Sequence, residues 1–555
     1  MKKILSFVFL AIIGLFLAGC ENVAVILSTS ATETTQNNNQ TTTLPDIVTT
    51  EKVVTKSPDA EKVDKIELTE GDVYNIHFWH IWGAQKSAVL GTLVSEFCQY
   101  MLDTYGVTVN IESTAQSDYG TLLSKTTTAI ASGDDSNVPN IVIGYPDHFA
   151  AYLKSQKIVS LDKYIDSENY GVDRNDFIKA YMEENNQFDG ITYSLPLSKS
   201  QEIMVYNKSA LDALDITIPY DHPMTWYELY SEWAKIKEYK ENYANFKYLI
   251  NYDSTDNMFI NFARQWKAPY TTNDGKLLVT DTRTVEMLTY LEGAFSRGFL
   301  SAPINYADTA KYGSEYFQQQ QMPFTIGSTA GVSYDVPTAT SADVKFVFEA
   351  CVGMVPQMTI DPNDSEYSMS VVQQGPNIAL LDKGTDEDEL VSWLLVKYLT
   401  SMEQYSPDDA DANEEGFIVG QNNSARFGID TGYFPVTESA YNSSLYKSHM
   451  AVGEAYFKNG YTLEGVKITN PDGTERDVTP KEKATLLSSQ VAYIAYLQSG
   501  WLRYDPAFAA TSTLFGSADI RKHAGECIDK VAKTPTYDAA TALRELLEAC
   551  TIKTN

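Results

Sequence analysis

The chain has 555 residues, 43% of them hydrophobic and 12% aromatic, so it can bury a large core and should form two or more domains. Its 42 basic and 73 acidic residues give a net charge of −31. This balance argues against a nucleic-acid partner, because phosphate contacts need a basic patch. The acidic net charge is still compatible with a single anionic ligand, because one buried arginine can outweigh the repulsion from distant surface carboxylates.

The first twenty residues have the pattern of an export signal. Lys2 and Lys3 precede an apolar run over residues 4–18, which is shorter than a bilayer span needs. The run ends in Leu17-Ala18-Gly19-Cys20, which resembles the bacterial lipobox. The resemblance implies a signal peptide over residues 1–19, cleavage before Cys20 and a diacylglycerol on its sulfur. The alternative is an ordinary signal peptide with a chance cysteine.

The segment after Cys20 is rich in Thr, Ser, Asn and Gln from about residue 25 to residue 55. Such a segment has too little apolar surface to offset the entropy lost on ordering. We expect residues 20–71 to form a lipidated flexible linker. Two or three acyl chains anchor a protein stably, so the body should be tethered at the outer face of the cytoplasmic membrane.

Strand and helix patterns alternate at the start of the body. Residues 73–80, 107–111 and 140–144 are predicted strands, and a helix is predicted over 119–132, ended by Gly133. Repeated strand–helix–strand order indicates an α/β fold with a mostly parallel sheet. Ligands bind such sheets at the carboxyl ends of the strands.

Two segments follow the ends of these strands and should therefore lie at one rim of the sheet. They are His80-Ile81-Trp82-Gly83 and Tyr145-Pro146-Asp147-His148. Elsewhere, Thr225 and Glu228 have the spacing of a helix capping box, and Trp226 between them is predicted to be a core residue. The acidic run over residues 408–415 lacks the pattern of an EF-hand calcium loop and is predicted to be a solvated loop.

Residues that commonly do catalysis or bind metals form no motif. The cysteines at positions 20, 98, 351, 527 and 550 include no closely spaced pair, so disulfides and buried thiols both stay open. His77 and His80 are three positions apart in a predicted strand and so face opposite sides. We expect no metal, no cofactor and no catalytic residue.

An ordered series of short motifs resembles the extracellular solute-binding lipoproteins of ABC importers, family 1, in their sugar and glycerol-3-phosphate branch. The motifs are Phe78-Trp79-His80, Ser117-Asp118-Tyr119, Pro139-Asn140-Ile141 with Tyr145, Leu195-Pro196 with Val205-Tyr206-Asn207-Lys208, Thr225-Trp226-Tyr227-Glu228-Leu229, residues 317–330, Gly432-Tyr433-Phe434-Pro435-Val436 and Ile520-Arg521. Each motif is weak alone, but the ordered set extends over most of residues 72–545.

The resemblance implies a type II periplasmic-binding-protein-like fold of two α/β lobes joined by crossing strands. The first lobe would comprise residues 72–199 and 328–400, and the second residues 200–327 and 401–550. The crossings would fall near Ser200 and Gly327. The resemblance also implies closure of the lobes on a ligand and delivery to the transmembrane subunits of an ABC permease.

The ligand-binding residues implied by the resemblance divide between two ligand classes. Those that align with contacts to glycerol-3-phosphate or its diesters are Tyr119, Ser200, Ser328, Tyr433 and Arg521. Arginine suits phosphate because its planar donors contact two oxygens. An acidic contact of those relatives falls on Pro146, however, and their tryptophan pair falls near Asn257 and Met258.

Asp147 aligns instead with an aspartate that maltose-type relatives use on sugar hydroxyls, and Trp82 is expected near the rim. A carboxylate would repel phosphate, so a mono- or oligosaccharide is the preferred ligand, with glycerol-3-phosphate or glycerophosphodiesters as the alternative. Two further alternatives stay open. One is a surface lipoprotein for sensing or adhesion. The other is a glycosidase using Asp147 and Glu202, whose carboxyl groups would stand about 5–10 Å apart.

Overall fold

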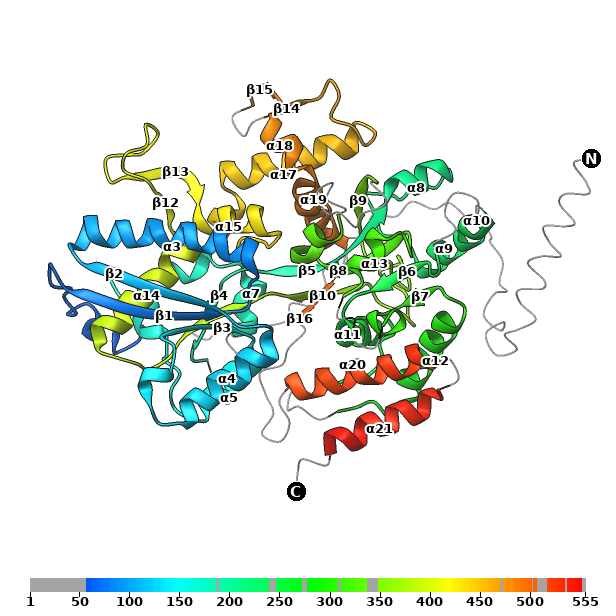
Figure 1. Ribbon diagram of the computed structural model, residues 1–555, viewed down its shortest axis with the longest axis horizontal. Coiled ribbons are helices and arrows are strands. Elements are labelled where there is room, and N and C mark those ends of the chain that lie inside the picture. The colour runs from blue at the N-terminus through cyan, green and yellow to red at the C-terminus, as the bar shows by residue number, and fades with distance from the viewer. Residues whose placement is uncertain are drawn as a thin grey trace, which may run out of the picture. The chain divides into compact units, whose positions relative to one another are not determined.

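The computed structural model describes residues 56–551 except for short internal gaps (Figure 1). The gaps are residues 186–187, 189, 239–245, 272–276, 308–309, 311, 337–347, 470–472, 502, 507–516 and 535–536. The predicted signal peptide, Cys20 and the linker up to residue 55 lie outside the described residues. None of the helices in the described part of the chain combines the length and hydrophobicity that crossing a bilayer requires.

The predicted linker extends too far toward the body. Residues 60–63 form helix α2 (Ala60–Val63), and the side chains of Ala60 and Val63 are buried. Asp64 accepts a hydrogen bond from the Ser167 hydroxyl, 2.5 Å away. Because α2 packs apolar side chains into the core and Asp64 bonds to Ser167, residues 56–71 belong to the folded body.

The first lobe is built on a five-stranded sheet with the order β2-β1-β3-β11-β4. Strands β1, β2 and β3 are parallel, and β11 runs antiparallel between β3 and β4. The pairing confirms the α/β class and the three predicted strands. These features could be predicted because they depend on local sequence periodicity. The strands are β1 (Val73–His80), β2 (Thr108–Ala115), β3 (Ile141–Gly144), β4 (Leu195–Pro196) and β11 (Asn377–Leu380).

Helices cover this sheet and share its hydrophobic core, which includes Phe78, Phe97, Ile143 and Trp393. The helical elements of the lobe are α3 (Ala84–Tyr105), α4 (Tyr119–Ala131), η1 (Asp135–Asn137), α5 (Pro146–Leu153), α6 (Asp162–Ile165), η2 (Arg174–Asp176), α7 (Lys179–Asn185), α14 (Asp386–Ser401) and α15 (Asn423–Thr431). Helix α4 ends just before Gly133, which has a φ of +70°.

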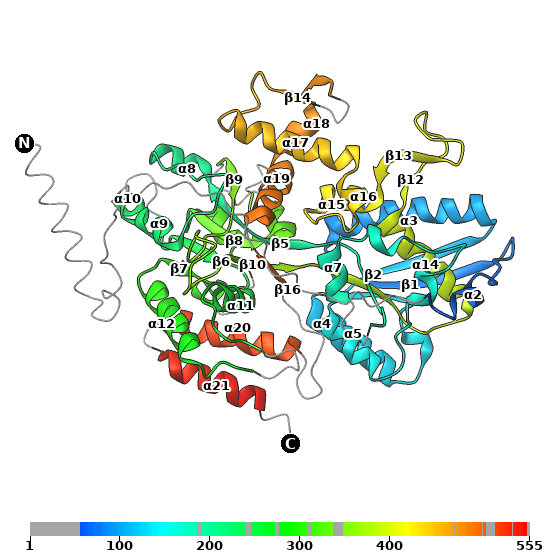
Figure 2. The same ribbon diagram turned by 180° about the vertical axis from the view of Figure 1, so that it is seen from behind.

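The second lobe is built on a seven-stranded sheet centred on β5 (Ser200–Asn207). Its other strands are β6 (Ile250–Tyr252), β7 (Leu300–Ser301), β8 (Phe324–Ser328), β9 (Ala350–Gly353), β10 (Ser370–Gln374) and β16 (Arg503–Pro506). All eight residues of β5 are buried. Helices α20 (Ser517–Lys533) and α21 (Ala539–Thr551) pack beside α11 (Thr255–Gln265) and α12 (Thr282–Ser296), as both ribbon views show (Figure 2).

The capping-box prediction is confirmed at the start of α9 (Trp226–Ser231). The Thr225 hydroxyl accepts from the Glu228 N–H, and Glu228 accepts from the Thr225 N–H. Trp226 is buried in the core, as predicted. The remaining helical elements of this lobe are α8 (Lys208–Ala213), α10 (Trp233–Glu238), η3 (Pro303–Asn305), α13 (Ser314–Gln318) and η4 (Thr329–Tyr334).

The strand pairing differs from the predicted lobe boundaries. Strands β9 and β10, inside the segment 328–400 predicted for the first lobe, both pair with β5 of the second sheet. The chain therefore changes sheet between β10 and β11, at residues 374–377, and not near Gly327. Conversely, Tyr405, Phe427 and Val436 pack in the core of the first lobe. We propose residues 57–199 and 376–436 as the first lobe, and 200–374 and 452–551 as the second.

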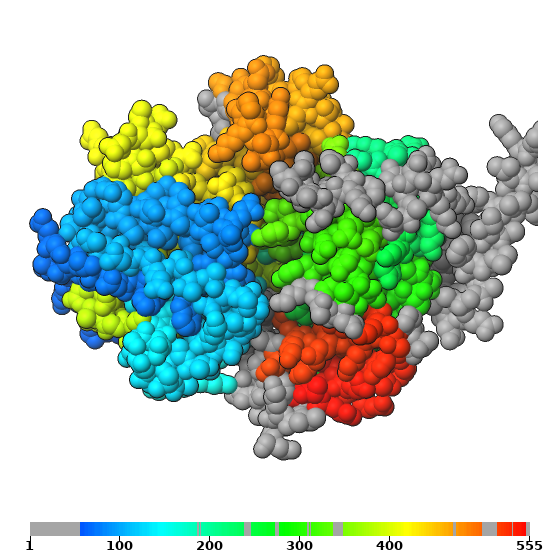
Figure 3. Space-filling view, in the orientation of Figure 1, coloured from blue at the N-terminus to red at the C-terminus, as the bar shows by residue number. Residues whose placement is uncertain are grey.

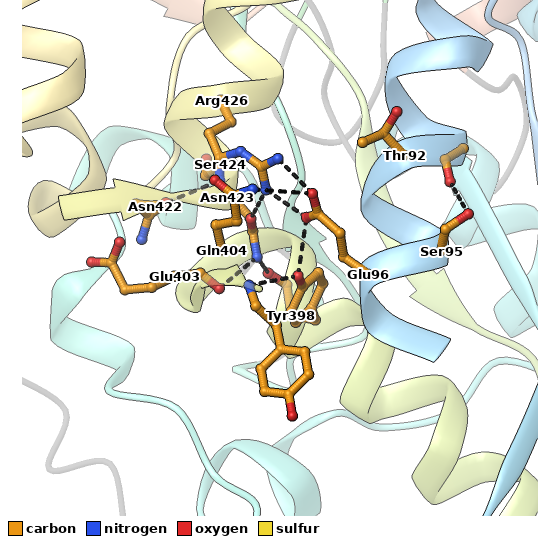
Figure 4. A network of polar contacts seen from close by, with 12 residues as sticks. Thr92, Ser95, Glu96, Tyr398, Glu403, Gln404, Asn422, Asn423, Ser424 and Arg426 are labelled. Atoms are coloured by element: carbon orange, nitrogen blue, oxygen red, sulfur yellow. Dashed lines mark hydrogen bonds and ion pairs between the residues drawn. The ribbon is translucent and has the colours of Figure 1, made fainter. Parts of the chain in front are cut away.

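A polar network attaches residues 403–426 to the first lobe (Figure 4). The Arg426 guanidinium contacts both oxygens of Glu96 on α3, at 2.6 and 2.8 Å. Asn423 donates to the carbonyl oxygens of Tyr398 and Glu403. The strand pair formed by β12 (Glu403–Tyr405) and β13 (Phe417–Asn422) is held there, and the acidic run 408–415 between them is almost wholly exposed, as predicted.

The segment after residue 437 forms α16 (Glu438–Tyr441), α17 (Ser444–Lys458), β14 (Lys467–Thr469), β15 (Glu475–Asp477), α18 (Pro480–Ala484) and α19 (Leu486–Trp501). Helices α17 and α19 pack together, and Tyr456, Phe457 and Ile494 join the core of the second lobe. Cys98, Cys351 and Cys527 are free thiols.

Candidate functional site

The carboxyl ends of β1 and β3 carry two groups of aromatic side chains, as the sheet topology predicts. In the first group, the Trp82 indole N–H donates to the Tyr433 hydroxyl over 3.3 Å. The Trp82 ring packs on Phe427, with 4.9 Å between the ring centroids. Trp82 leaves only 2% of its surface exposed and borders a small apolar cavity with Leu197 and Leu399. The structure therefore joins two predicted site residues, Trp82 and Tyr433, and buries both.

The second group lies at the end of β3, where helix α5 begins. The rings of Tyr119 and Tyr145 are 4.3 Å apart at their centroids, and His148 lies 6.0 Å from Tyr119. Asp147, in the first turn of α5, is buried and accepts a hydrogen bond from the His148 N–H at 3.0 Å. The two predicted residues Tyr119 and Asp147 thus come from different helices to one end of the first sheet.

Ser200 and Ser328 are brought close by strand pairing in the second lobe. Ser328 ends β8 and lies opposite Glu202 in the ladder, while Ser200 begins β5 two residues earlier. The Ser328 hydroxyl accepts from the Ala330 N–H at 3.3 Å and so caps the turn η4. Both serines therefore lie where the second sheet approaches the crossing segments.

Arg521 has a carboxylate partner that the sequence pattern does not reveal. Its Nε donates to an Asp256 oxygen at 3.0 Å, its Nη2 forms a second bond to the same oxygen, and Nη2 also donates to Asn257 at 2.9 Å. Burial alone would raise the pKa of Asp256, but the Arg521 charge holds it below its usual range. The guanidinium charge is thus largely neutralised inside the second lobe.

Arg521 nevertheless lies within electrostatic reach of the first-lobe residues. Burial raises the pKa of Tyr145, and the Arg521 charge opposes that increase. For His148, burial lowers the pKa, and the Arg521 charge lowers it further. Helix α20 contacts α5, so the second lobe meets the end of β3 through these side chains.

Glu202, one of the two acids considered for glycosidase chemistry, is fully buried in β5. It accepts a hydrogen bond from the Tyr252 hydroxyl. Burial raises the pKa of Glu202 to about 8, while Tyr252 and Asn257 oppose the increase. The carboxyl group is therefore largely protonated at neutral pH and belongs to the interior network around Asp256.

Lys86 is a buried cation that the sequence analysis did not single out. It lies in the first turn of α3 with 8% of its surface exposed, and its ammonium donates to the Ala330 carbonyl at 2.7 Å. The same nitrogen stands 5.1 Å from the centre of the Tyr334 ring and 5.8 Å from that of Tyr433. In the space-filling view, blue atoms from the part of the chain that includes α3 meet green atoms of the second lobe along one seam (Figure 3).

Within the described residues there is no group of three or more His, Cys, Asp or Glu side chains that could hold a metal ion. The polar groups described above are instead single carboxylates, hydroxyls and cations beside aromatic rings. Such a set suits a hydroxylated organic molecule, which needs a few placed polar groups and apolar faces.

Comparison with known proteins identifies the family. The model of the bacterial extracellular solute-binding protein family matches residues 92–406, more than half of the chain. The chain belongs to this family. A protein of Brucella abortus (strain 2308) described as a binding protein is 31% identical over 163 residues, which are 29% of this chain and 36% of that relative. The matched part thus spans about a third of the curated relatives' length.

Solved structures share the fold of this solute-binding protein. UgpB of Mycobacterium tuberculosis, in complex with glycerophosphocholine, has a TM-score of 0.58 at 16% identity, covering 86% of this chain and 98% of UgpB. Lmo0181 of Listeria monocytogenes, in complex with cycloalternan, has a TM-score of 0.57 at 16% identity, covering 87% and 98%. Maltose-bound MalE3 of T. maritima has a TM-score of 0.58 at 12% identity, covering 86% and 99%. At these identities the similarity shows the two-lobe periplasmic-binding-protein fold.

The crossing segments of the solute-binding protein meet at Lys199. Its backbone N–H and carbonyl both pair with Phe434. Its ammonium, fully buried, donates to Glu184 at 2.5 Å and to Asn377 at 2.8 Å. Gly375 has a φ of +119°, and a Cβ there would lie 2.4 Å from the Ser198 carbonyl oxygen. Lys199 thus belongs to the crossing segment 198–200 and bonds to the two other segments, 374–377 and 433–435.

Proposed function

We propose that this solute-binding protein captures a carbohydrate between its two lobes and delivers it to the transmembrane subunits of an ABC permease. The residues proposed to contact the solute are Trp82, Tyr119, Asp147, Ser200, Ser328, Tyr433 and Arg521. The protein would be held at the outer face of the cytoplasmic membrane by lipid on Cys20.

The observation that carries the preference for carbohydrate is the pairing of Arg521 with Asp256. A phosphate group bound at Arg521 would need a guanidinium whose charge is not already cancelled, but Asp256 contacts this guanidinium at 3.0 Å. Arg521 can still donate hydrogen bonds to neutral hydroxyl groups. In the same region, the Asp147 carboxylate suits hydroxyl donors and would repel phosphate.

The aromatic side chains support the same class of solute. The paired rings of Tyr119 and Tyr145 lie at the end of β3, where Asp147 begins α5, and the ring of Tyr433 packs with Trp82. Sugars present apolar C–H faces as well as hydroxyl edges, so a binding site needs both kinds of surface. Closure of the lobes follows if the solute binds the closed arrangement more tightly than the open one.

A second candidate is a glycerophosphodiester, because one structural neighbour was solved with glycerophosphocholine. The two classes make opposite demands on Asp147. Truncating an acceptor of sugar hydroxyls leaves them unpaired, at a cost of about 1–3 kcal/mol. For a phosphodiester, the same truncation removes a repulsion.

The experiment is calorimetry of the wild-type protein and Asp147→Ala against neutral oligosaccharides and glycerophosphodiesters. We expect wild type to bind an oligosaccharide and Asp147→Ala to bind it about five- to 150-fold more weakly. Asp408→Ala, in the exposed acidic loop, is the matched control and should bind as wild type does. Binding of phosphodiesters alone, kept or improved in Asp147→Ala, would contradict the carbohydrate proposal.

A further inference from the structure

Lys86 is held where the two lobes meet, by described groups none of which carries an opposite charge. Within the part of the chain that the structure describes, the one hydrogen bond of its ammonium goes to the neutral carbonyl of Ala330, two residues after Ser328. Its other close neighbours are the rings of Tyr334 and Tyr433. Among the described residues, no carboxylate forms an ion pair with Lys86, whereas Lys199 pairs with Glu184 and Arg521 with Asp256.

The position is unfavourable for a positive charge on two counts. The first turn of an α-helix carries the positive end of the helix dipole, and α3 has no acidic residue in that turn. Burial also penalises the charged form, which lowers the pKa of Lys86 to about 8. The ammonium is still largely charged at neutral pH. A charge kept at such a cost, beside proposed solute-binding residues, calls for a partner that arrives with the solute.

The neighbours of the Lys86 ammonium indicate where such a partner would bind. An ammonium has three N–H donors, of which the structure assigns one, to Ala330. The centre of the Tyr433 ring lies 5.8 Å from the ammonium nitrogen, and the Tyr433 hydroxyl accepts a hydrogen bond from the Trp82 indole. Lys86 therefore borders the first aromatic group of the site. An anionic oxygen bound here would gain charge-assisted hydrogen bonds in a water-poor environment.

We propose that Lys86 receives a negatively charged group of the solute, so that the captured molecule is an acidic carbohydrate carrying a carboxylate or a phosphate. This inference rests on the proposed carbohydrate-binding function and specifies its ligand. The hydroxyl groups would be bound at the Asp147 side of the site, and the charge at the Lys86 side. A solute with hydroxyls at one end and one charge at the other satisfies both residues without placing an anion against Asp147.

The test is calorimetry with matched neutral and acidic probes. The first pair is an oligosaccharide of glucose and one of glucuronic acid with equal length. The second pair is glucose with glucose 6-phosphate, and the third is glycerol with glycerophosphocholine. The proteins are wild type, Lys86→Gln, Lys86→Arg and Lys62→Gln, all purified as the same chain and compared for folding by circular dichroism. Lys62 is a suitable control because its side chain is 80% exposed.

We expect wild type to prefer the acidic member of a sugar pair at least tenfold. Lys86→Gln should weaken that acidic sugar about 10- to 100-fold and change the neutral one less than about threefold. Lys86→Arg, which keeps the charge, should stay within about fivefold of wild type, and Lys62→Gln should match it. Which of the first two pairs responds identifies the group as carboxylate or phosphate.

The opposing outcomes separate the two proposals. Equal affinity for neutral and acidic sugars, or equal weakening of both by Lys86→Gln, overturns the role of Lys86 and leaves the carbohydrate proposal standing. Binding of glycerophosphocholine alone overturns the carbohydrate proposal, and with it the acidic sugar. If no probe binds to wild type, both proposals fail for these ligand classes.

Discussion

Arg521 and Lys86 are equally buried, with 8% of each residue exposed, yet the two lobes treat their charges differently. Arg521, on α20, bonds to Asp256 and Asn257, so its charge has a fixed partner. Lys86, on α3, bonds only to a neutral carbonyl among the described residues and lies over aromatic rings. Burial alone therefore does not identify a ligand-binding cation. In our proposal, the cation that has no counter-charge among the described residues, Lys86, is the one that receives the charged group of the solute.

The largest effect is expected at Lys199, where pairing is most complete. Lys199→Met would leave the buried Glu184 carboxylate without its cation, which typically costs about 3–5 kcal/mol in the free energy of unfolding. Urea unfolding measures this loss. Glu184→Gln combined with Lys199→Met should recover much of it, because no buried charge remains. If the single variant loses less than about 1 kcal/mol, the pair does not hold the crossing segments.

Arg521 should follow, with a somewhat smaller loss. Arg521→Leu would leave Asp256 unpaired, but the Asp256 side chain is 28% exposed, so water can partly solvate it. We expect a loss of about 2–4 kcal/mol in the free energy of unfolding. In the variant Arg521→Leu with Asp256→Leu, the loss should shrink. An unchanged stability in Arg521→Leu would mean that Asp256 does not depend on this guanidinium, contrary to our comparison.

Glu202 allows a pH test of the same interior network. Its pKa in the folded protein is raised to about 8 by burial, against about 4.5 when unfolded. The folded state therefore binds more protons between those values, and this contribution to stability is lost as pH rises from about 5 through 8. Relative to Glu202→Gln, wild type should lose about 2–4 kcal/mol over that interval, measured by urea unfolding at pH 5, 6.5 and 8. Parallel pH profiles for the two proteins would refute the assignment.

The first sheet was predictable because its signals are local. Residues 73–144 carry strand and helix periodicities, and Gly133 ends a helix where a positive φ is needed. The capping box of Thr225 and Glu228 likewise depends on residues three positions apart. Such patterns can be recognised in a window of a few residues.

The lobe boundaries were not predictable in that way, because pairings between distant strands set them. Strand β10 pairs with β5 although some 170 residues of sequence separate Ser200 from Gln374. Similarly, the partner of Arg521 is Asp256, 265 positions away. Lys86 looks in sequence like an ordinary lysine near a helix start. Only the approach of Ala330, Tyr334 and Tyr433 in the fold shows that it is buried.

The smallest effect on stability is expected at Lys86 itself. Lys86→Met removes one hydrogen bond to Ala330, worth about 1 kcal/mol, but also removes a charge that burial and the helix dipole disfavour. The two changes nearly cancel, so the free energy of unfolding at pH 7 without ligand should stay within about 1 kcal/mol of wild type. A loss above about 3 kcal/mol would instead place Lys86 with Lys199, as a structural cation.

A pH series sharpens this last prediction. Burial lowers the pKa of Lys86 to about 8 from the unfolded value of 10.5, so between these values the unfolded state binds more protons. Wild type should therefore gain stability relative to Lys86→Met as pH rises from 7 to 9.5. Any acidic solute bound to Lys86 should weaken over the same range, because the ammonium loses its charge. Stability and affinity moving in opposite directions with pH are the expected signature of a cation kept for its ligand.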